Sequence, residues 1–519
     1  MLRLFLPLAS ALLLILAFPR FEVAYLAWIG LVPLLAAIRR SGPASAGALA
    51  YLAGISFFMG IFSWINVIPG FTLTDFLLLG VYLGSYWGWF GLALSFLTRR
   101  GRLSPVLAAP VIWVSLEYLR SHAGFLALPW ALLGQSQYQL LPVIQMAAFT
   151  GVYGISFVIV MVNALLSEIL LALVAGSRGS PSRCEMRLLP YALATLGVVT
   201  VSLVYGFWAL SAKPTGEGIR TCLIQGNIPQ AIKWQNQYRT MILEKYCRLT
   251  TQAAQADRPT LMLWPESAVP GPFLQDSQAT HTVFTLAQSI RTHLLLGSAQ
   301  RPKLGERNLV LTHRYNSVFL ISPESTITGY HHKMYLLPFA EYLPYREVWP
   351  WPKRLAAHAG DFIPGQNYTI FELNGIKFGV AICWENIFPD LIRQFVARGA
   401  EFIVNVTNEA WFEDTAAPHQ FVMMSVFRAV ENRVTVARAA NTGITCVIDP
   451  WGRISGIVAD RGKCLFVEGF LTRTLPRRQQ TSFYTRYGEV FSYLNMVIFL
   501  SLLLSVLLKR VYRKADHGH

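Results

Sequence analysis

The sequence predicts a membrane-embedded bundle of about eight helices joined to an α/β domain. Hydrophobic residues make up 54% of the 519-residue chain, which is more than an ordinary soluble protein contains. The long apolar runs gather before residue 213 and again near the C-terminus, whereas the residues between have a globular composition. We therefore expect a transmembrane bundle of about seven helices at 1–212, a water-exposed domain at 213–486, and a C-terminal transmembrane helix with a basic tail at 487–519.

Apolar runs mark the expected spans, because a bilayer core needs roughly 20 residues per helix. We place the spans at Leu4–Phe18, Val23–Ile38, Ala44–Ile65, Phe76–Leu97, Val106–Leu119, Val143–Leu173, Leu188–Leu210 and Val490–Leu508. The first and fifth are short. The first also resembles a cleavable signal peptide, but no small-residue cleavage site follows it before the next apolar run.

The distribution of Lys and Arg predicts the orientation, because loops rich in these residues stay in the cytoplasm. With a cytoplasmic N-terminus, the cytoplasmic loops carry Arg39 and Arg40, then Arg99, Arg100 and Arg102, then Arg178, Arg183 and Arg187, and finally the cluster at 509–514. The alternate loops at 66–74 and 123–142 contain no Lys or Arg. We expect both termini in the cytoplasm and 213–486 in the periplasm of a bacterial inner membrane.

The net charge of +16 fits this topology together with attraction to anionic lipid headgroups in the bilayer. No zinc-binding, helix-turn-helix or aromatic-basic pattern predicts nucleic-acid binding. The six cysteines show no CxxC pair, and five of them, all but Cys184, fall in the expected external domain. Because five is an odd number, at least one thiol should remain free, and Cys383 is the candidate.

Residues 219–470 alternate short β-rich runs with stretches of helical period, which predicts a layered α/β fold. The expected strands are Thr221–Gln225, Thr260–Trp264, His293–Gly297, Ser317–Ser322, Ile376–Ile382, Phe402–Val406, Val434–Ala439 and Thr445–Asp449. The expected helices include Tyr238–Gln255, Ala279–Arg291 and Phe388–Arg398. In such folds, catalytic groups lie at strand ends and in the loops that follow.

Three polar residues each follow an apolar, strand-like run in this domain: Glu266, Lys333 and Cys383. Taken singly, each has a structural alternative: a helix cap for Glu266, a solvated charge for Lys333, and a small buried hydrophobe for Cys383. Together they supply the parts of a nucleophilic site. The carboxylate takes the proton of the thiol, and the ammonium stabilises an oxyanion with the backbone N–H after the cysteine.

This chemistry needs no metal, and we expect neither a metal nor a cofactor. The histidines His331, His332 and His419 lack metal-ligand spacing, so a structural or solvated role is expected for each.

The Glu-Lys-Cys order resembles the nitrilase, or carbon–nitrogen hydrolase, superfamily. The motifs that carry the resemblance are Pro-Glu-Ser at 265–267, His-His-Lys at 331–333 and Ile-Cys-Trp-Glu-Asn at 382–386. The resemblance implies an αββα sandwich with Glu266, Lys333 and Cys383 as the catalytic trio.

The helices before and after this domain narrow the resemblance to the apolipoprotein N-acyltransferase family, as do the segments 225–230, 333–344 and 428–433. This resemblance implies supporting roles for Trp234, Glu341 and Glu385, and we count Trp384, which follows the cysteine, among the supporting residues as well. Glu341 would orient the Lys333 and Glu266 pair, and Trp234 would lie on a mobile loop over the acyl site.

Two departures from the family pattern bear on the acyl pocket. Trp384 stands where many members carry Tyr, and the segment 408–413 reads Asn-Glu-Ala-Trp-Phe-Glu where the family commonly has Asn-Asp-Ala-Trp-Phe-Gly.

The implied reaction moves a fatty acyl chain from a membrane phospholipid to a thioester on Cys383. The acyl chain then passes to the α-amine of the N-terminal diacylglyceryl-cysteine of an apolipoprotein. The alternative is a membrane-tethered amidase or hydrolase acting on a small C–N substrate, although a tether needs one helix rather than eight. An ion-coupled transporter is disfavoured because carboxylates are few in the predicted spans, and an inactive lipid-binding scaffold would have no reason to retain Glu, Lys and Cys together.

Overall fold

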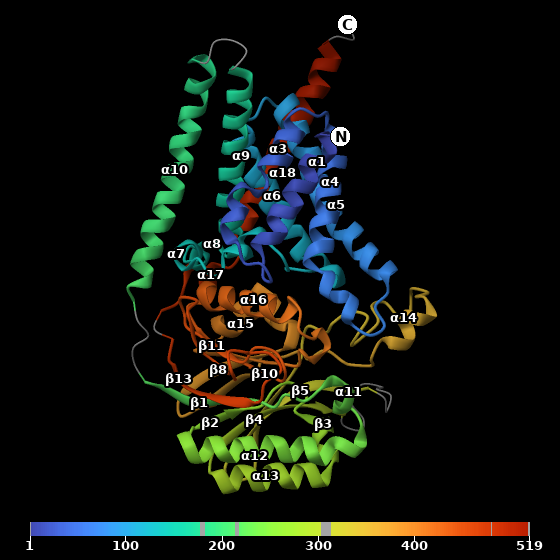
Figure 1. Cartoon of the computed structure of the whole chain (residues 1–519), viewed down its shortest axis with the longest axis vertical. Helices are drawn as coiled ribbons and strands as arrows, with labels where there is room; N and C mark the ends of the chain where they lie inside the picture. Colours follow the sequence, from blue (N-terminus) through green and yellow to red (C-terminus); the bar gives the residue numbers. More distant parts are fainter. Residues whose placement is uncertain (1, 177–181, 213–216, 303–312, 479, 517–519) are drawn as a thin grey trace. The chain divides into compact units, whose positions relative to one another are not determined.

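The computed structural model describes residues 2–176, 182–212, 217–302, 313–478 and 480–516 (Figure 1). The chain forms two compact units, one of residues 1–66, 71–212 and 487–519 and the other of residues 67–70 and 213–486. Arg178 and the expected boundary at 213 lie outside the described residues, as do the side chains of Arg183, Cys184 and Arg187.

The first unit is helical. Its helices are α1 (Leu2–Ala17), α2 (Ala27–Gly30), α3 (Val32–Arg39), α4 (Pro43–Ile61), α5 (Leu73–Arg100), α6 (Pro105–Ser121), α7 (Leu141–Ile144), α8 (Ala147–Thr150), α9 (Val152–Gly176), α10 (Ser182–Leu210) and α18 (Val490–Asp516). Glycines let α4 and α5 approach closely, since a Cβ at Gly91 would lie 2.4 Å from the carbonyl oxygen of Ala46. Small residues at such crossings are typical of helices that pack within a membrane.

Five of the described helices are long and apolar enough to cross a membrane: Pro43–Ile61, Leu73–Arg100, Val152–Val174, Leu188–Leu210 and Val490–Lys509. The protein is therefore membrane-embedded, but the expected number of eight spans is not confirmed. The stretches Leu4–Ala17 and Ala24–Arg39 are shorter apolar helices. The expected single span Val143–Leu173 is wrong, because Gly151 has a φ of +63° and separates α8 from α9.

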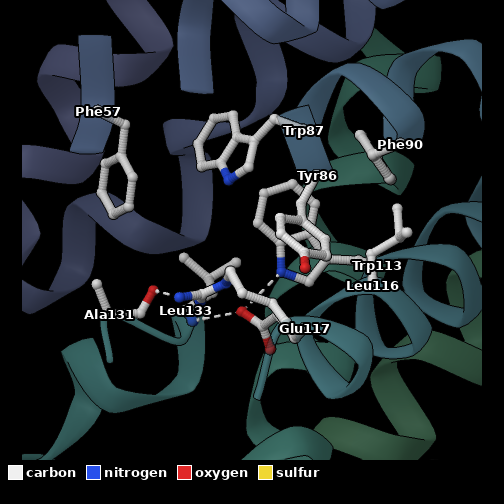
Figure 2. A pocket seen from close by; sticks show the side chains of 10 residues that line it. Phe57, Tyr86, Trp87, Phe90, Trp113, Leu116, Glu117, Ala131 and Leu133 are labelled. Carbon is white, nitrogen blue, oxygen red and sulfur yellow. Dashed lines mark hydrogen bonds between the residues drawn. The ribbon is translucent and has the colours of Figure 1, made fainter. Parts of the chain in front are cut away.

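A cavity in the helical unit is lined mainly by aromatic side chains, together with Glu117 and Arg120 of α6 (Figure 2). Glu117 Oε1 accepts hydrogen bonds from the indole N–H of Trp113 at 2.9 Å and the backbone N–H of Leu133 at 2.7 Å. Arg120 donates to the backbone carbonyl of Trp130 at 2.7 Å. These two buried charged side chains thus fasten the segment after α6 to the helix.

The second unit contains two sheets. The seven-stranded sheet has the order β13-β1-β2-β4-β5-β6, with β3 also pairing with β4. Its strands are β1 (Gly218–Gln225), β2 (Leu261–Leu263), β3 (Val269–Pro272), β4 (His293–Gln300), β5 (Tyr315–Ile321), β6 (Ile327–His332) and β13 (Gly469–Pro476). The six-stranded sheet has the order β12-β11-β10-β9-β8-β7. Its strands are β7 (Ile370–Leu373), β8 (Ile376–Ile382), β9 (Phe402–Thr407), β10 (Thr435–Ala440), β11 (Cys446–Ile448) and β12 (Ile454–Ile457).

The two sheets pack face to face between two pairs of helices, as Figure 1 shows for this unit. Helices α12 (Arg239–Asp257) and α13 (Ser277–Ile290) cover the first sheet, and α15 (Pro389–Ala397) and α16 (Ala417–Asn432) cover the second. One apolar core lies between the sheets, with Leu263 and Val318 from the first and Val380 and Val404 from the second. This arrangement confirms the expected αββα sandwich.

All eight expected strands and the three expected helices of this domain are present, with ends that differ by a few residues. The sequence did not predict β3, β6, β7, β12, β13 or α16.

Candidate active site

Cys383 lies where β8 ends and a short 3₁₀ turn, Cys383–Ile387, begins. Its φ is +58°, a conformation that a non-glycine residue rarely adopts and that often marks a functional position. Because β8 and β9 run parallel with Ile382 opposite Val406, the cysteine lies level with the end of β9. The chain therefore turns sharply at Cys383, and the cysteine follows a strand, as the sequence predicts.

Glu266 follows β2 by three residues, and its side chain is only 8% exposed. Its Oε1 accepts a hydrogen bond from the side-chain amide of Asn316 at 2.8 Å, and its Oε2 accepts one from the backbone N–H of Asn408 at 2.9 Å. Asn316 belongs to the first sheet, whereas Asn408 follows β9 of the second. The carboxylate is therefore held from both sheets.

Lys333 comes directly after β6 and is 2% exposed. Its Nζ donates to Glu341 Oε1 at 2.9 Å and lies 4.0 Å from Glu266 Oε1. The amide of Asn316 also donates to Glu341 Oε1, at 3.2 Å. Glu341 and Asn316 thus hold the ammonium of Lys333 and the carboxylate of Glu266 near each other.

The electrostatics of the site keep the thiol protonated and the amine charged at rest. Burial and the nearby Glu266 raise the pKa of Cys383 to about 12, although Lys333 opposes the shift. Burial by itself lowers the pKa of Lys333, but the charges of Glu341, Cys383 and Glu266 outweigh that effect and raise it. A thiol that is held protonated in this way becomes nucleophilic only when a neighbouring base takes its proton.

Glu385 connects the loop after Lys333 to the turn that carries Cys383. Its Oε1 accepts from the backbone N–H groups of Met334 at 2.6 Å and Tyr335 at 2.9 Å, and its Oε2 accepts from that of Ile382 at 2.7 Å. The carboxylate is fully buried, and this burial raises its pKa to about 7.

The other two predicted supporting residues differ in placement. The indole N–H of Trp384 donates to the backbone carbonyl of Tyr335 at 2.6 Å, so this residue fixes the same loop. Trp234 is 50% exposed and makes no hydrogen bond to the trio within the part of the chain that the structure describes. Its neighbour Lys233 is the residue that points into the site, where its Nζ donates to the backbone carbonyl of Glu266 at 3.2 Å.

Sequence reasoning missed a buried polar group behind the cysteine. The amide of Asn405 donates to the carbonyl oxygens of Ala381 at 3.0 Å and Cys383 at 3.2 Å. Arg438 donates to Asn405 Oδ1 at 2.6 Å and pairs with Glu409. Glu409 belongs to the segment already noted as departing from the family pattern, which was the one available signal.

No group of three or more His, Cys, Asp or Glu side chains that could hold a metal ion occurs in the described ranges. The cysteines described, Cys222, Cys247, Cys383, Cys446 and Cys464, are all free thiols.

An αββα sandwich of this kind, with a thiol, a carboxylate and an ammonium at its strand ends, is the fold of the carbon–nitrogen hydrolase class of enzymes. Residues 220–465 match the carbon-nitrogen hydrolase family, and residues 10–165 match the apolipoprotein N-acyltransferase N-terminal domain.

Two apolipoprotein N-acyltransferases match nearly the whole chain. The apolipoprotein N-acyltransferase of Geobacter metallireducens is 38% identical over 93% of this chain and 91% of its own length. That of Chlorobaculum tepidum is 28% identical over 94% of this chain and 93% of its own. The chain belongs to the apolipoprotein N-acyltransferase family and is an acyltransferase. An amidase structure from Nesterenkonia is 19% identical, with a TM-score of 0.38 over 51% of this chain and 94% of that one.

Proposed function

We propose that this enzyme transfers a fatty acyl chain from a membrane phospholipid, through a thioester on Cys383, to the α-amino group of an N-terminal diacylglyceryl-cysteine of an apolipoprotein. The observation that carries the proposal is the assembly of the Cys383 thiol, the Glu266 carboxylate and the Lys333 ammonium at one edge of the two sheets. Membership of the family and the membrane helices support the choice of lipid and lipoprotein as substrates.

In the first half-reaction, Glu266 accepts the thiol proton as the sulfur of Cys383 attacks the ester carbonyl carbon of the phospholipid. The carbonyl oxygen becomes an oxyanion, which the ammonium of Lys333 and the backbone N–H of Trp384 stabilise. When the intermediate collapses, the C–O bond breaks, and the lysophospholipid oxygen takes the proton from Glu266. The products are a thioester on Cys383 and a lysophospholipid.

In the second half-reaction, the neutral α-amine of the acceptor attacks the thioester carbonyl, and Glu266 accepts a proton from the attacking nitrogen. The C–S bond then breaks, the amide forms, and the proton on Glu266 returns to the sulfur. An α-amine has a pKa of about 8, so a useful fraction is neutral near physiological pH. The same base therefore serves both halves of the reaction.

Exposed apolar side chains occur in the loop that follows Glu341. Val348 and Trp349 are 82% and 60% exposed, which is unusual for side chains of this kind on a water-facing loop. Such residues suit the headgroup boundary of a bilayer. Contact with lipid would also keep water away from the thioester.

The distribution of Lys and Arg supports a location in the inner membrane, with the catalytic domain in the periplasm and both termini in the cytoplasm. A periplasmic domain would meet exported lipoproteins on the side of the membrane where their modified N-termini lie.

The test is to incubate the purified full-length enzyme with labelled phospholipid and look by mass spectrometry for an acyl adduct on Cys383. We expect the adduct in the wild type and in Cys464→Ala, a control that removes another free thiol, and no adduct in Cys383→Ser or Cys383→Ala. Adding a diacylated lipopeptide should discharge the adduct rapidly. If the adduct instead decays equally fast to free fatty acid without the lipopeptide, the hydrolase alternative is correct.

A further inference from the structure

Lys233 is a buried cation next to the catalytic trio that the mechanism above does not use. It ends α11 (Gln230–Lys233) and is 1% exposed. The one hydrogen bond of its ammonium in the described part of the chain is the 3.2 Å bond to the backbone carbonyl of Glu266, and no carboxylate there forms an ion pair with it. Lys333, by contrast, has Glu341 at 2.9 Å.

An unpaired ammonium is costly inside a protein, typically by several kcal/mol. Burial lowers the pKa of Lys233 to about 8, while the nearby Glu266 and Cys383 favour its charged form. A methionine of similar length would fill the same space without this cost. Packing alone therefore gives no reason for a lysine here.

The segment that carries Lys233 is fastened to the second sheet. The backbone N–H of Asn227 donates to the carbonyl of Asn441 at 2.9 Å, and the side chain of Asn441 exchanges hydrogen bonds with the backbone of Ile228 at 2.9 and 2.8 Å. Asn441 also donates to Asn408, whose backbone N–H binds Glu266. The position of Lys233 is thus set by the same residues that position the base.

We propose that Lys233 is a positioning residue whose ammonium balances the negative charge of Glu266 and Cys383, an inference that rests on the proposed function. The two cations Lys233 and Lys333 then offset the charges of the two carboxylates Glu266 and Glu341 while the thiol is protonated. When the proton moves from Cys383 to Glu266, the sulfur carries a negative charge and both ammonium groups stabilise it. Lys233 also joins the base to the segment that continues into Trp234.

The test uses the full-length enzyme in detergent and the water-soluble probe iodoacetamide, which alkylates a thiolate. The alkylation rate of Cys383 is measured by mass spectrometry from pH 6 to 10 in the wild type, Lys233→Met and Lys233→Arg. Loss of the charge should slow alkylation at neutral pH about tenfold, the effect of one pKa unit, and shift the pH profile upward. Lys233→Arg should retain most of the rate. Lys377→Met, which removes an exposed lysine from β8, is the matched control and should behave as wild type.

Thermal unfolding separates this role from a merely structural one. Because Lys233→Met removes an unpaired buried charge, the variant should unfold at the same temperature as the wild type or higher, while its cysteine reacts more slowly. Wild-type alkylation in Lys233→Met would overturn the proposal. Slower alkylation accompanied by a lower unfolding temperature and no rescue by Lys233→Arg would also overturn it, in favour of a structural role.

The alkylation measurement needs no lipid, so it is independent of the proposed substrate. Labelled phospholipid added to the same samples gives the second readout, in which Lys233→Met should form the acyl adduct about tenfold more slowly. If the wild type forms no adduct although its alkylation depends on Lys233, the proposed acyl transfer fails and the charge balance at Cys383 stands.

Discussion

Several residues near the site, among them Cys383 and Glu413, occupy backbone conformations that their side chains disfavour. Cys383 has a φ of +58° at the point where its sulfur must project from the turn. Glu413 has a φ of +50° and a ψ of −157°, close to a region that is essentially restricted to glycine. The family commonly has glycine at the position of Glu413, so the glutamate carries a cost in backbone strain. The strain at Cys383 has a functional reason in the role proposed for its thiol.

Replacing Glu413 by glycine should therefore stabilise the protein. The relief of backbone strain is partly offset by the larger entropy of glycine in the unfolded chain, which leaves a gain of about 1 kcal/mol. Thermal unfolding in detergent measures it. Asn374→Gly is a suitable control, because Asn374 also has a positive φ, of +51°, but asparagine tolerates that region. An equal gain in both variants would contradict the explanation.

Asn316 offers a test of the carboxylate arrangement. Its amide donates to both Glu266 and Glu341, so Asn316→Ala should slow acyl-adduct formation by about 10- to 100-fold through misplacement of the base. Asn316→Asp keeps the shape but puts a third acceptor between two carboxylates, and it should be slower still. Adduct formation on Cys383 after a millisecond-to-minute quench gives the rates. Faster adduct formation in Asn316→Asp than in Asn316→Ala would show that the amide donor of Asn316 is not needed.

Among single residues, the sequence predicted the candidate site residues that follow strands in recognisable motifs. Glu266, Lys333 and Cys383 each end an apolar run, and the structure brings them together. Asn316 and Lys233 could not be predicted in the same way. Each lies among residues of ordinary composition, and only the folded chain brings its side chain to the site.

Among the elements, the loop after β6 and the turn after β8 are joined by one carboxylate. Glu385 accepts hydrogen bonds from Met334, Tyr335 and Ile382, which flank Lys333 and Cys383. Lys333, the proposed oxyanion-stabilising cation, and Cys383, the proposed nucleophile, are therefore held at fixed positions relative to each other through this side chain.

The raised pKa of Glu385, about 7, predicts a pH dependence. Protonation removes acceptor capacity from the carboxylate, so adduct formation should fall as the pH drops through 7. Glu385→Gln should remove this step and remain at the low rate throughout. A pH profile of adduct formation in both proteins tests it, and an unchanged step in Glu385→Gln would assign the step to another group.

The raised pKa of Glu385 also affects the stability of the folded protein, with the opposite dependence on pH. The folded pKa of Glu385 lies above the ordinary value of about 4.3, so the folded state binds this proton more readily than the unfolded chain. The contribution of Glu385 to the free energy of unfolding therefore falls as the pH rises from about 4.3 toward 7.

The elements that the sequence did not predict share physical causes. Strand β3 contains two prolines, and β12 is an edge strand with mostly exposed side chains. Helix α16 is buried almost all round and carries the internal ion pair of Arg428 and Glu431. A helix without a polar face shows no amphipathic period from which to predict it.

For the whole molecule, hydropathy predicted the membrane bundle but not its number of spans. A run of apolar residues does not reveal where a helix breaks. The break at Gly151, between α8 and α9, is an example. Leu4–Ala17 has the apolar composition of a span, but it is shorter than the five helices that are long enough to cross a membrane.

The orientation is a prediction for the whole molecule. After Leu210, a fused reporter that works only in the periplasm, such as alkaline phosphatase, should be active. At the C-terminus, only a reporter that works in the cytoplasm should be active. The control is a fusion after Arg102, in a loop expected to be cytoplasmic. Cytoplasmic behaviour after Leu210 would exclude the proposed location and the access to exported lipoproteins that it provides.

The proposed catalytic trio is divided between the two sheets of the sandwich. Glu266 and Lys333 follow strands of one sheet and Cys383 follows a strand of the other, with Leu263, Val318 and Val380 in the apolar layer between. The thickness of that layer therefore sets the distance from the Cys383 thiol to the Glu266 carboxylate and the Lys333 ammonium. A displacement of about 1 Å can cost about 100-fold in rate. The side chains of the core therefore determine the geometry of the site, and substitutions among them are constrained by catalysis as well as by folding.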